Sequence, residues 1–321
     1  MNKDDLPKTM QEAFAFFSDE QRCHDFMVWK RWPDGKPVCP RCDSQNIGKC
    51  SPAPRRVWNC KGCKKQFTVK VATIFEDSPL PLTKWLPAFW MIVNAKNAIS
   101  SCELARSLGV SQKTAWFMGH RIRLAIREGM SNMMKGRVEA DESFIGALSR
   151  YVHKDKRSEK ITGTGGSGKT AVMGLLERGT REKSSRVTLR VLKTTKRAEL
   201  QGYVRQCVER DSEVLTDNNA AYWGLQGEYV HNVIDHAVSY ANGHIHTNGL
   251  ENFWALLKRS IKGTHVHVAP FHLFRYLDDQ AYRFNQRRSD DSDRFIDSLS
   301  TIANRRLTFK KLTAKDEREK K

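Results

Sequence analysis

The sequence predicts an α/β protein in which a mixed-sheet region follows a small cysteine-rich ribbon and a helix-turn-helix. Three observations lead to this prediction. Residues 137–217 show three short strand patterns, then a helical pattern and a fourth strand pattern. Two CxxC pairs lie between residues 39 and 63, and residues 101–126 show two helical patterns that meet at a glycine.

The composition indicates a globular protein with a polyanionic partner. The chain has 321 residues, and 55 Lys and Arg against 36 Asp and Glu give a net charge of +19. No apolar run reaches the length of a membrane span, and the polar start MNKDDLPKTMQEAFAFF lacks the layout of a secretory signal. A positive surplus of this size is suited to displacing counterions from phosphates, although the charge alone does not distinguish such a protein from a generic basic or ribosome-associated one.

The first two segments are a helical arm over residues 1–30, with Ser18 as a cap within it, and a ribbon over 31–77. The ribbon carries CPRC and CKGC, with 17 residues between the pairs. Each pair at this spacing can present two thiolates from a tight turn to one tetrahedral zinc ion. We therefore expect Cys39, Cys42, Cys60 and Cys63 to bind Zn²⁺, and a β-branched stretch, QFTVKVATIF, to pair within the ribbon.

Residues 78–132 are expected to form a DNA-binding helix-turn-helix. Its first helix ends at Gly109, and Ser111 is a good N-cap for the second helix. The first residues of that helix, Gln112, Lys113 and Thr114, would then face the major groove. A plain helical hairpin in a core is the alternative.

Residues 133–290 have the mixed α/β pattern, and residues 291–321 read as a basic tail. The expected strands cover 137–146, 171–179, 185–192 and 212–217, with helices over 198–210, from about 247, and over 271–288. Residues 163–170, GTGGSGKT, match a phosphate-binding loop. That motif needs a strand before it and a helix after it, whereas a polar run precedes it and a strand pattern follows, so no nucleotide is expected.

Three acids in this region are candidates for a metal site. Asp141 lies within the first strand, Asp217 ends a later one, and Glu251 lies on the helix from about 247, two turns before Lys258. Carboxylates from two strands and a helix can hold two Mg²⁺ ions about 3.5–4 Å apart for in-line phosphoryl displacement. From the residues alone, other acids remain open as ligands, namely Glu139, Glu142 and Asp235.

The chain resembles the DDE-type transposases of bacterial insertion sequences, in the group with an N-terminal zinc ribbon. The resemblance covers residues from about 12 to 288 and rests on WNCKGCKKQFTV, ELARSLGVSQKTAWFMGHRIR, VEADESFIG, LTDNNAAY and HTNGLENFWALLKRSIKGTHVHV. It implies an RNase H-like core with Asp141 and Asp217 as the first two acids and Glu251 as the third. Asn248 is the alternative third ligand, because some branches of the family have Asn there, and His246 would support the site or contact DNA.

The resemblance also implies the activity. The protein would bind the terminal inverted repeats of an insertion sequence, cleave its ends and join the 3′ hydroxyl to target DNA. Zn²⁺ would be structural and Mg²⁺ catalytic, with Mn²⁺ able to substitute, and Lys258, Arg259 and Lys262 would contact DNA. A homo-oligomer on DNA and a cytoplasmic, nucleoid-associated location are expected. The alternative, a non-catalytic DNA-binding regulator, leaves residues 133–290 without a role.

Overall fold

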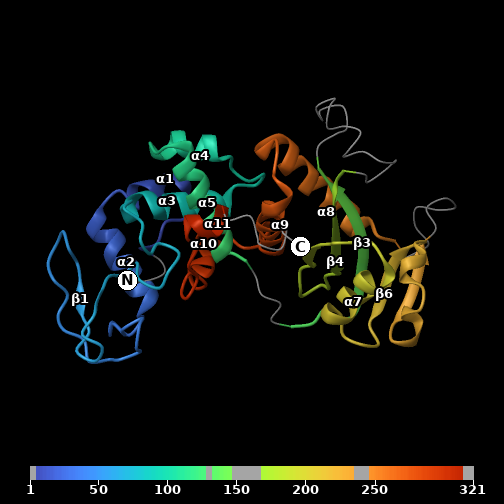
Figure 1. Cartoon of the computed structure of the whole chain (residues 1–321), viewed down its shortest axis with the longest axis horizontal. Coiled ribbons are helices and arrows are strands. Elements are labelled where there is room, and N and C mark those ends of the chain that lie inside the picture. The colour runs from blue at the N-terminus through green and yellow to red at the C-terminus, as the bar shows by residue number, and fades with distance from the viewer. Residues whose placement is uncertain (1–4, 128–131, 147–167, 235–245, 314–321) are drawn as a thin grey trace. The chain divides into compact units, whose positions relative to one another are not determined.

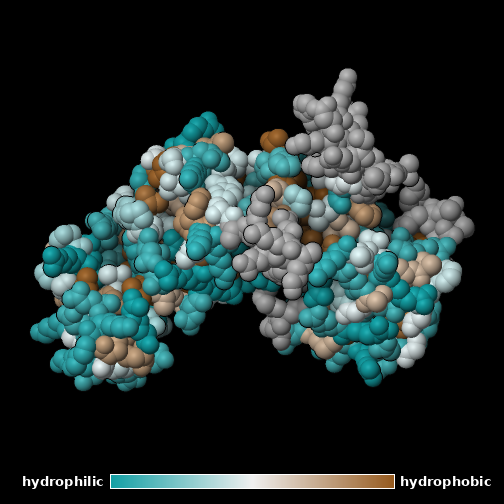
Figure 2. Space-filling model, in the orientation of Figure 1, coloured by the Kyte–Doolittle hydropathy of each residue, from teal (hydrophilic) through white to brown (hydrophobic). Residues whose placement is uncertain are grey.

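A computed structural model describes residues 5–127, 132–146, 168–234 and 246–313. The chain divides into two compact units, the first made of Met1–Ile126 and Ser289–Lys321 and the second of Arg127–Arg288. Figure 1 shows the elements of both units. On the face shown in Figure 2, hydrophilic residues cover most of the surface of each unit.

The first unit opens with two short helices, where the sequence predicted one helical arm. Helix α1 spans Met10–Phe16 and α2 spans Glu20–Arg31. Thr9 caps α1, and the Asp19 side chain accepts a hydrogen bond from the third amide of α2, so Asp19 rather than Ser18 is the cap. A carboxylate at this position also interacts favourably with the helix dipole, which a serine hydroxyl does more weakly.

The ribbon follows, and its sheet is smaller than predicted. Strand β1 spans Trp58–Asn59 and pairs antiparallel with β2, which spans Gln66–Phe67. The residues after Phe67 form turns rather than the predicted longer strand. The Lys70 ammonium donates to the carbonyls of Ser78 and Leu80, at 3.2 and 2.6 Å, and so holds these turns together.

Three helices form the next part of the first unit. Helix α3 spans Leu82–Asn94 and is buried along nearly its whole length. Helix α4 spans Ser101–Leu108, and α5 spans Gln112–Ala125. Gly109 adopts a left-handed backbone conformation, with φ of 61°, at the turn between α4 and α5, and the Ser111 hydroxyl caps α5, as the sequence predicted.

The C-terminal stretch corrects the expectation of a basic tail over 291–321. Within it, α10 spans Asp291–Leu299 and a short helix, α11, spans Phe309–Thr313. Phe295 is fully buried and packs against the rings of Phe17, Phe26 and Trp90. Apolar residues spaced along one face of α10 explain this packing, and the surrounding charges lie on the other face.

The second unit is built on a five-stranded mixed sheet in the order β5-β4-β3-β6-β7. Its strands are β3 (Arg137–Ile145), β4 (Thr170–Glu177), β5 (Arg186–Val191), β6 (Glu213–Asp217) and β7 (Val230–Ile234). The first three pair antiparallel, whereas β6 runs parallel to β3, and β7 runs parallel to β6. The sequence predicted the first four of these, and β7 was not assigned. Because β4 begins at Thr170, the last residue of the loop motif is the first residue of a strand; residues 163–167 lie outside the described residues.

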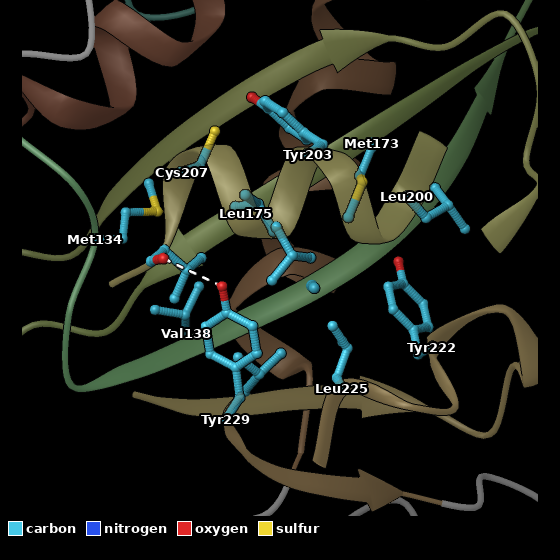
Figure 3. Packing of buried hydrophobic residues seen from close by; sticks show 14 of the residues in the cluster. Met134, Val138, Met173, Leu175, Leu200, Tyr203, Cys207, Tyr222, Leu225 and Tyr229 are labelled. Atoms are coloured by element: carbon cyan, nitrogen blue, oxygen red, sulfur yellow. Dashed lines mark hydrogen bonds between the residues drawn. The ribbon is translucent and has the colours of Figure 1, made fainter. Parts of the chain in front are cut away.

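Helices cover the two faces of this sheet. Helix α7 (Arg197–Cys207) packs on one face, over a cluster that includes Val138, Leu175 and Tyr203 (Figure 3). Helices α8 (Asn248–Arg259) and α9 (Pro270–Asn285) pack on the other face, over a cluster that includes Val172 and Leu176. Successive residues of a strand alternate between the two faces. Because Val138 of β3 faces α7, the odd-numbered acids of the same strand, Glu139 and Asp141, lie on the face that carries α8.

The described part of the second unit also contains three shorter helical elements. Short 3₁₀ turns cover Ala220–Tyr222 and Leu225–Gly227 after β6, and a π-helix, Ser260–His265, continues α8. None of the described helices is long and apolar enough to cross a membrane.

Candidate metal centre and active site

The four cysteines of the ribbon form a compact cluster. Their Sγ atoms, from Cys39, Cys42, Cys60 and Cys63, all lie within 4.8 Å of one another. Cys39 and Cys63 are separated by 3.7 Å between Sγ atoms, and Cys42 and Cys60 by 3.6 Å. A tetrahedral zinc ion with Zn–S bonds of about 2.3 Å requires sulfur atoms about 3.8 Å apart. The donor set therefore fits a structural Zn²⁺ ion.

Local backbone structure places these thiols. Both turns contain a non-glycine residue with a left-handed backbone, Asp43 in the first and Lys64 in the second. The amide of Cys63 donates to Cys60 Sγ at 3.4 Å, and this hydrogen bond is the largest of several contacts that lower the pKa of the Cys60 thiol to about 6. A lowered pKa favours the thiolate, which is the form that binds metal. The other cysteines, Cys23, Cys50, Cys102 and Cys207, lie outside the cluster.

Asp141 and Asp217 occupy equivalent positions on neighbouring parallel strands. The register of β3 against β6 pairs Glu139 with Leu215. Asp141 and Asp217 each follow two residues later, so both side chains lie on the same face of the sheet. The parallel pairing thus brings together two acids that are 76 residues apart in the sequence.

Glu251 reaches the same region from helix α8. It lies in the first turn of α8 and is exposed, whereas Leu250, Phe253, Trp254 and Leu257 of the same helix are buried. Trp254 Nε1 donates to Asp141 Oδ2 at 2.9 Å, so α8 is attached to the strand that carries the first acid. This hydrogen bond joins residues 113 positions apart, so no local sequence pattern predicts it.

The surroundings of Asp141 disfavour its charged form. Burial, together with the negative charges of Asp217 and Glu251, raises the pKa of Asp141 to about 6, although the Trp254 hydrogen bond opposes this shift. Burial likewise raises the pKa of Glu142 to about 7. A divalent cation with oxygen ligands would favour the charged forms of these carboxylates.

The three acids are more widely spaced than the cysteines. Among the described residues, only the cysteine cluster brings three or more potential ligand atoms within 4.8 Å of one another. Asp141, Asp217 and Glu251 are close enough for the charges of the other two to shift the pKa of Asp141. The oxygen donors suit Mg²⁺ in chemical type.

The alternative acids have other partners in the structure. Both carboxylate oxygens of Glu139 are engaged, one by Arg178 and the other by the amide of Leu250. Glu142 points to the opposite face of β3, where it accepts hydrogen bonds from Tyr222 and Asn219. Asp235 lies outside the described residues.

The predicted DNA contacts fall into two groups. The first group is exposed: Lys258 and Arg259 end α8, and Lys262 lies in the π-helix that follows it. At the start of α5, the side chain of Gln112 donates to Ser101 Oγ at 2.7 Å. The Lys113 ammonium lies 4.9 Å from the centre of the Phe309 ring. Thr114 Oγ1 lies 2.8 Å from Ser111 Oγ. These three side chains thus contact neighbouring parts of the first unit.

Two segments of the chain match families of known proteins. Residues 133–285 match the ISXO2-like transposase domain, and residues 18–66 match the transposase zinc-ribbon domain. A protein in the transposable element ISH50 of Halobacterium salinarum is 28% identical over 273 residues, which are 81% of this chain and 89% of the relative. A transposase-like protein of Haemophilus influenzae is 32% identical over 96 residues, which are 30% of this chain and 77% of the relative.

Proposed function

Because the chain belongs to the ISXO2-like transposases with an N-terminal zinc ribbon, we propose that it binds the terminal inverted repeats of an insertion sequence, cleaves its ends and joins them to target DNA. The observation that carries this proposal is the placement of Asp141 and Asp217 at equivalent positions of adjacent parallel strands, with Glu251 interacting electrostatically with Asp141. The strand order β5-β4-β3-β6-β7, with three antiparallel strands followed by two parallel ones, supports an RNase H-like fold for this unit.

Asp141, Asp217 and Glu251 are the proposed ligands of the catalytic Mg²⁺, for which Mn²⁺ can substitute. When bound, the divalent ion would lower the pKa of the attacking hydroxyl and stabilise the leaving oxygen. The residues of the chain would hold the ion and position the DNA. The sheet holds Asp141 and Asp217, and α8 presents Glu251 together with Lys258, two turns further along. Lys258 would then contact a phosphate close to the bond that is cut.

DNA recognition is assigned to the first unit and to the basic end of α8. The zinc ribbon and the α4–α5 pair would bind the repeats, with Gln112, Lys113 and Thr114 reaching base edges after leaving their contacts within the protein. Arg259 and Lys262 would add phosphate contacts beside Lys258. Since two ends must be joined in one reaction, we propose that the protein acts as a homo-oligomer on DNA.

The test is strand cleavage of a duplex that carries the end of the element encoding the chain. The full-length protein should cut this duplex with added Mg²⁺ and should not cut without it. Alanine at Asp141, Asp217 or Glu251 should abolish cutting while leaving binding intact. Asp211→Asn, at an exposed position of the same unit whose left-handed backbone asparagine tolerates, is the matched control and should cut like the wild type.

Two results would overturn the proposal. Cutting without added divalent cation would refute the metal-dependent mechanism. Footprinting of the ends with no cleavage under Mg²⁺ or Mn²⁺ would instead identify a non-catalytic DNA-binding regulator. Alanine at Asn248 decides between the two candidates for the third ligand, because it should preserve cutting if Glu251 is the ligand.

A further inference from the structure

The N-terminus of α8 is capped by a residue from a distant part of the chain. Thr247, at the N-cap position, makes no side-chain capping hydrogen bond. Glu139 on β3 does this instead, because its Oε2 accepts from the amide of Leu250 at 2.8 Å. The amides at a helix N-terminus need acceptors, and a negative charge there interacts favourably with the helix dipole. Glu139 provides both and is only 1% exposed.

Arg178 fixes the orientation of the Glu139 carboxylate. Its Nε lies 2.7 Å from Glu139 Oε1, in an ion pair whose side chains are 16% and 1% exposed. The same guanidinium donates to the carbonyl of His246 and to its Nδ1, both at 2.7 Å. Since a guanidinium only donates, His246 Nδ1 accepts and the ring carries its proton on Nε2. Arg178 thus connects the cap to His246, which lies two residues before the start of α8.

A second contact lies one turn further along α8. Trp254 Nε1 donates to Asp141 Oδ2, four residues after Leu250 on the helix and two residues after Glu139 on the strand. Two strand residues span about 6.6 Å. Four helix residues span about 6.0 Å. Because the two spacings match and α8 runs in the same direction as β3, both hydrogen bonds can form at once. Together they fix the position of α8 along β3, which we call the register of α8 on β3.

Two glycines permit this close approach. A Cβ on Gly249 would lie 2.8 Å from Glu139 Oε2. A Cβ on Gly174, which pairs with Asp141 across the sheet, would lie 2.8 Å from the Trp254 ring. Side chains at these positions would push the helix away from the sheet. The two hydrogen bonds and the two glycines therefore favour the same position of α8.

We propose that Glu139 is a positioning residue: held by Arg178, it fixes the register of α8 on β3 and so places Glu251 relative to Asp141. This inference rests on the proposed function for its catalytic consequence. A slip of α8 by one turn would move Glu251 by about 5.4 Å along the sheet, away from the two aspartates. Glu139 itself need not touch metal or DNA.

The first test measures the helix itself. Amide hydrogen exchange of α8 is compared in the full-length wild type, Glu139→Gln and Gly249→Ala. We expect exchange at Leu250 and Glu251 to accelerate on the order of tenfold in both variants, because the cap is weakened. Gly249→Ala keeps both partners of the ion pair and provides a second perturbation if Glu139→Gln folds poorly. Gly202→Ala is the control, since a Cβ at that position in α7 meets nothing within 4 Å.

The second test measures cleavage of the element-end duplex by the same variants. In Glu139→Gln and Gly249→Ala the rate at saturating DNA should fall on the order of a hundredfold, as expected for a misplacement of about 1 Å. The dissociation constant for DNA should stay unchanged, which separates positioning from a general loss of structure. Gly202→Ala should match the wild type in both quantities.

The outcomes separate the two proposals. If Glu139→Gln and Gly249→Ala exchange and cleave like Gly202→Ala, the positioning role is refuted. If exchange accelerates but the cleavage rate is unchanged, Glu139 caps α8 without placing Glu251, and the inference is equally overturned. If the wild type does not cleave, the proposed function fails, and faster exchange confined to the two variants would still support the register of α8 on β3.

Discussion

Asp141→Asn should stabilise the second unit when no divalent cation is added. The carboxylate of Asp141 is half-buried near Asp217 and Glu251, and its pKa is raised from 3.8 to about 6. Above pH 6 the folded protein therefore holds a charge that its surroundings disfavour, whereas in the unfolded chain water solvates that charge. Asparagine removes the charge and still offers an oxygen to accept the hydrogen bond from Trp254.

The magnitude follows from the shift in pKa. Each unit corresponds to about 1.4 kcal/mol, so a rise of about two units costs the wild type about 3 kcal/mol of unfolding free energy at pH 8. Because the folded-state pKa is raised, the folded protein binds the proton more tightly than the unfolded chain. The cost is therefore complete above pH 6, declines between pH 6 and about 4, and is absent below the unfolded pKa.

Urea unfolding of the two proteins measures this difference, in buffer where the ribbon keeps its zinc and no other divalent cation is present. Asp141→Asn should exceed the wild type by about 3 kcal/mol at pH 8 and match it near pH 3.5. Asp211→Asn is the control, because Asp211 is exposed and Asn tolerates its left-handed backbone. A difference that is independent of pH, or a less stable Asp141→Asn at pH 8, would refute the reasoning.

Three further predictions concern the metals and DNA. Cys42→Ser should lose the bound zinc measured by atomic absorption, whereas Cys102→Ser, at an exposed cysteine outside the cluster, should keep it; equal zinc content would contradict the assignment. Lys258→Ala should lower the slope of log affinity against log salt for duplex DNA by about one, and an unchanged slope would remove Lys258 from the phosphate contacts. Because Asp141 must lose its proton to bind a cation and its pKa is about 6, the affinity for Mn²⁺ should fall as the pH drops below 6, and titrations at pH 5 and 8 with equal affinities would argue against Asp141 as a ligand.

The sequence predicted those features that local residue patterns determine. The CxxC spacing identified the cysteine cluster, and the strand patterns placed Asp141 within β3 and Asp217 at the end of β6. The turn at Gly109 followed from the glycine and the N-cap serine beside it. In each case the information lies within a few neighbouring residues.

The features that were missed depend on contacts between distant residues. Strand β7 has exposed valines at an edge, so its burial pattern does not alternate cleanly. Helix α10 lies in a stretch rich in charge, and its apolar face is recognisable only once Phe295 is seen against its partners. The cap provided by Glu139 to α8 joins residues 111 positions apart, which a local pattern cannot reveal. The glycine at 249, early in a helix, was the available signal.

Binding of Mn²⁺ to the zinc-loaded, full-length protein tests the central claim most directly. Isothermal titration at pH 8 should show binding in the wild type and its loss in Asp141→Asn, Asp217→Asn and Glu251→Gln, while Asp211→Asn binds normally. If the three site variants bind Mn²⁺ as the wild type does, these carboxylates do not form a cation site, and the catalytic assignment is wrong.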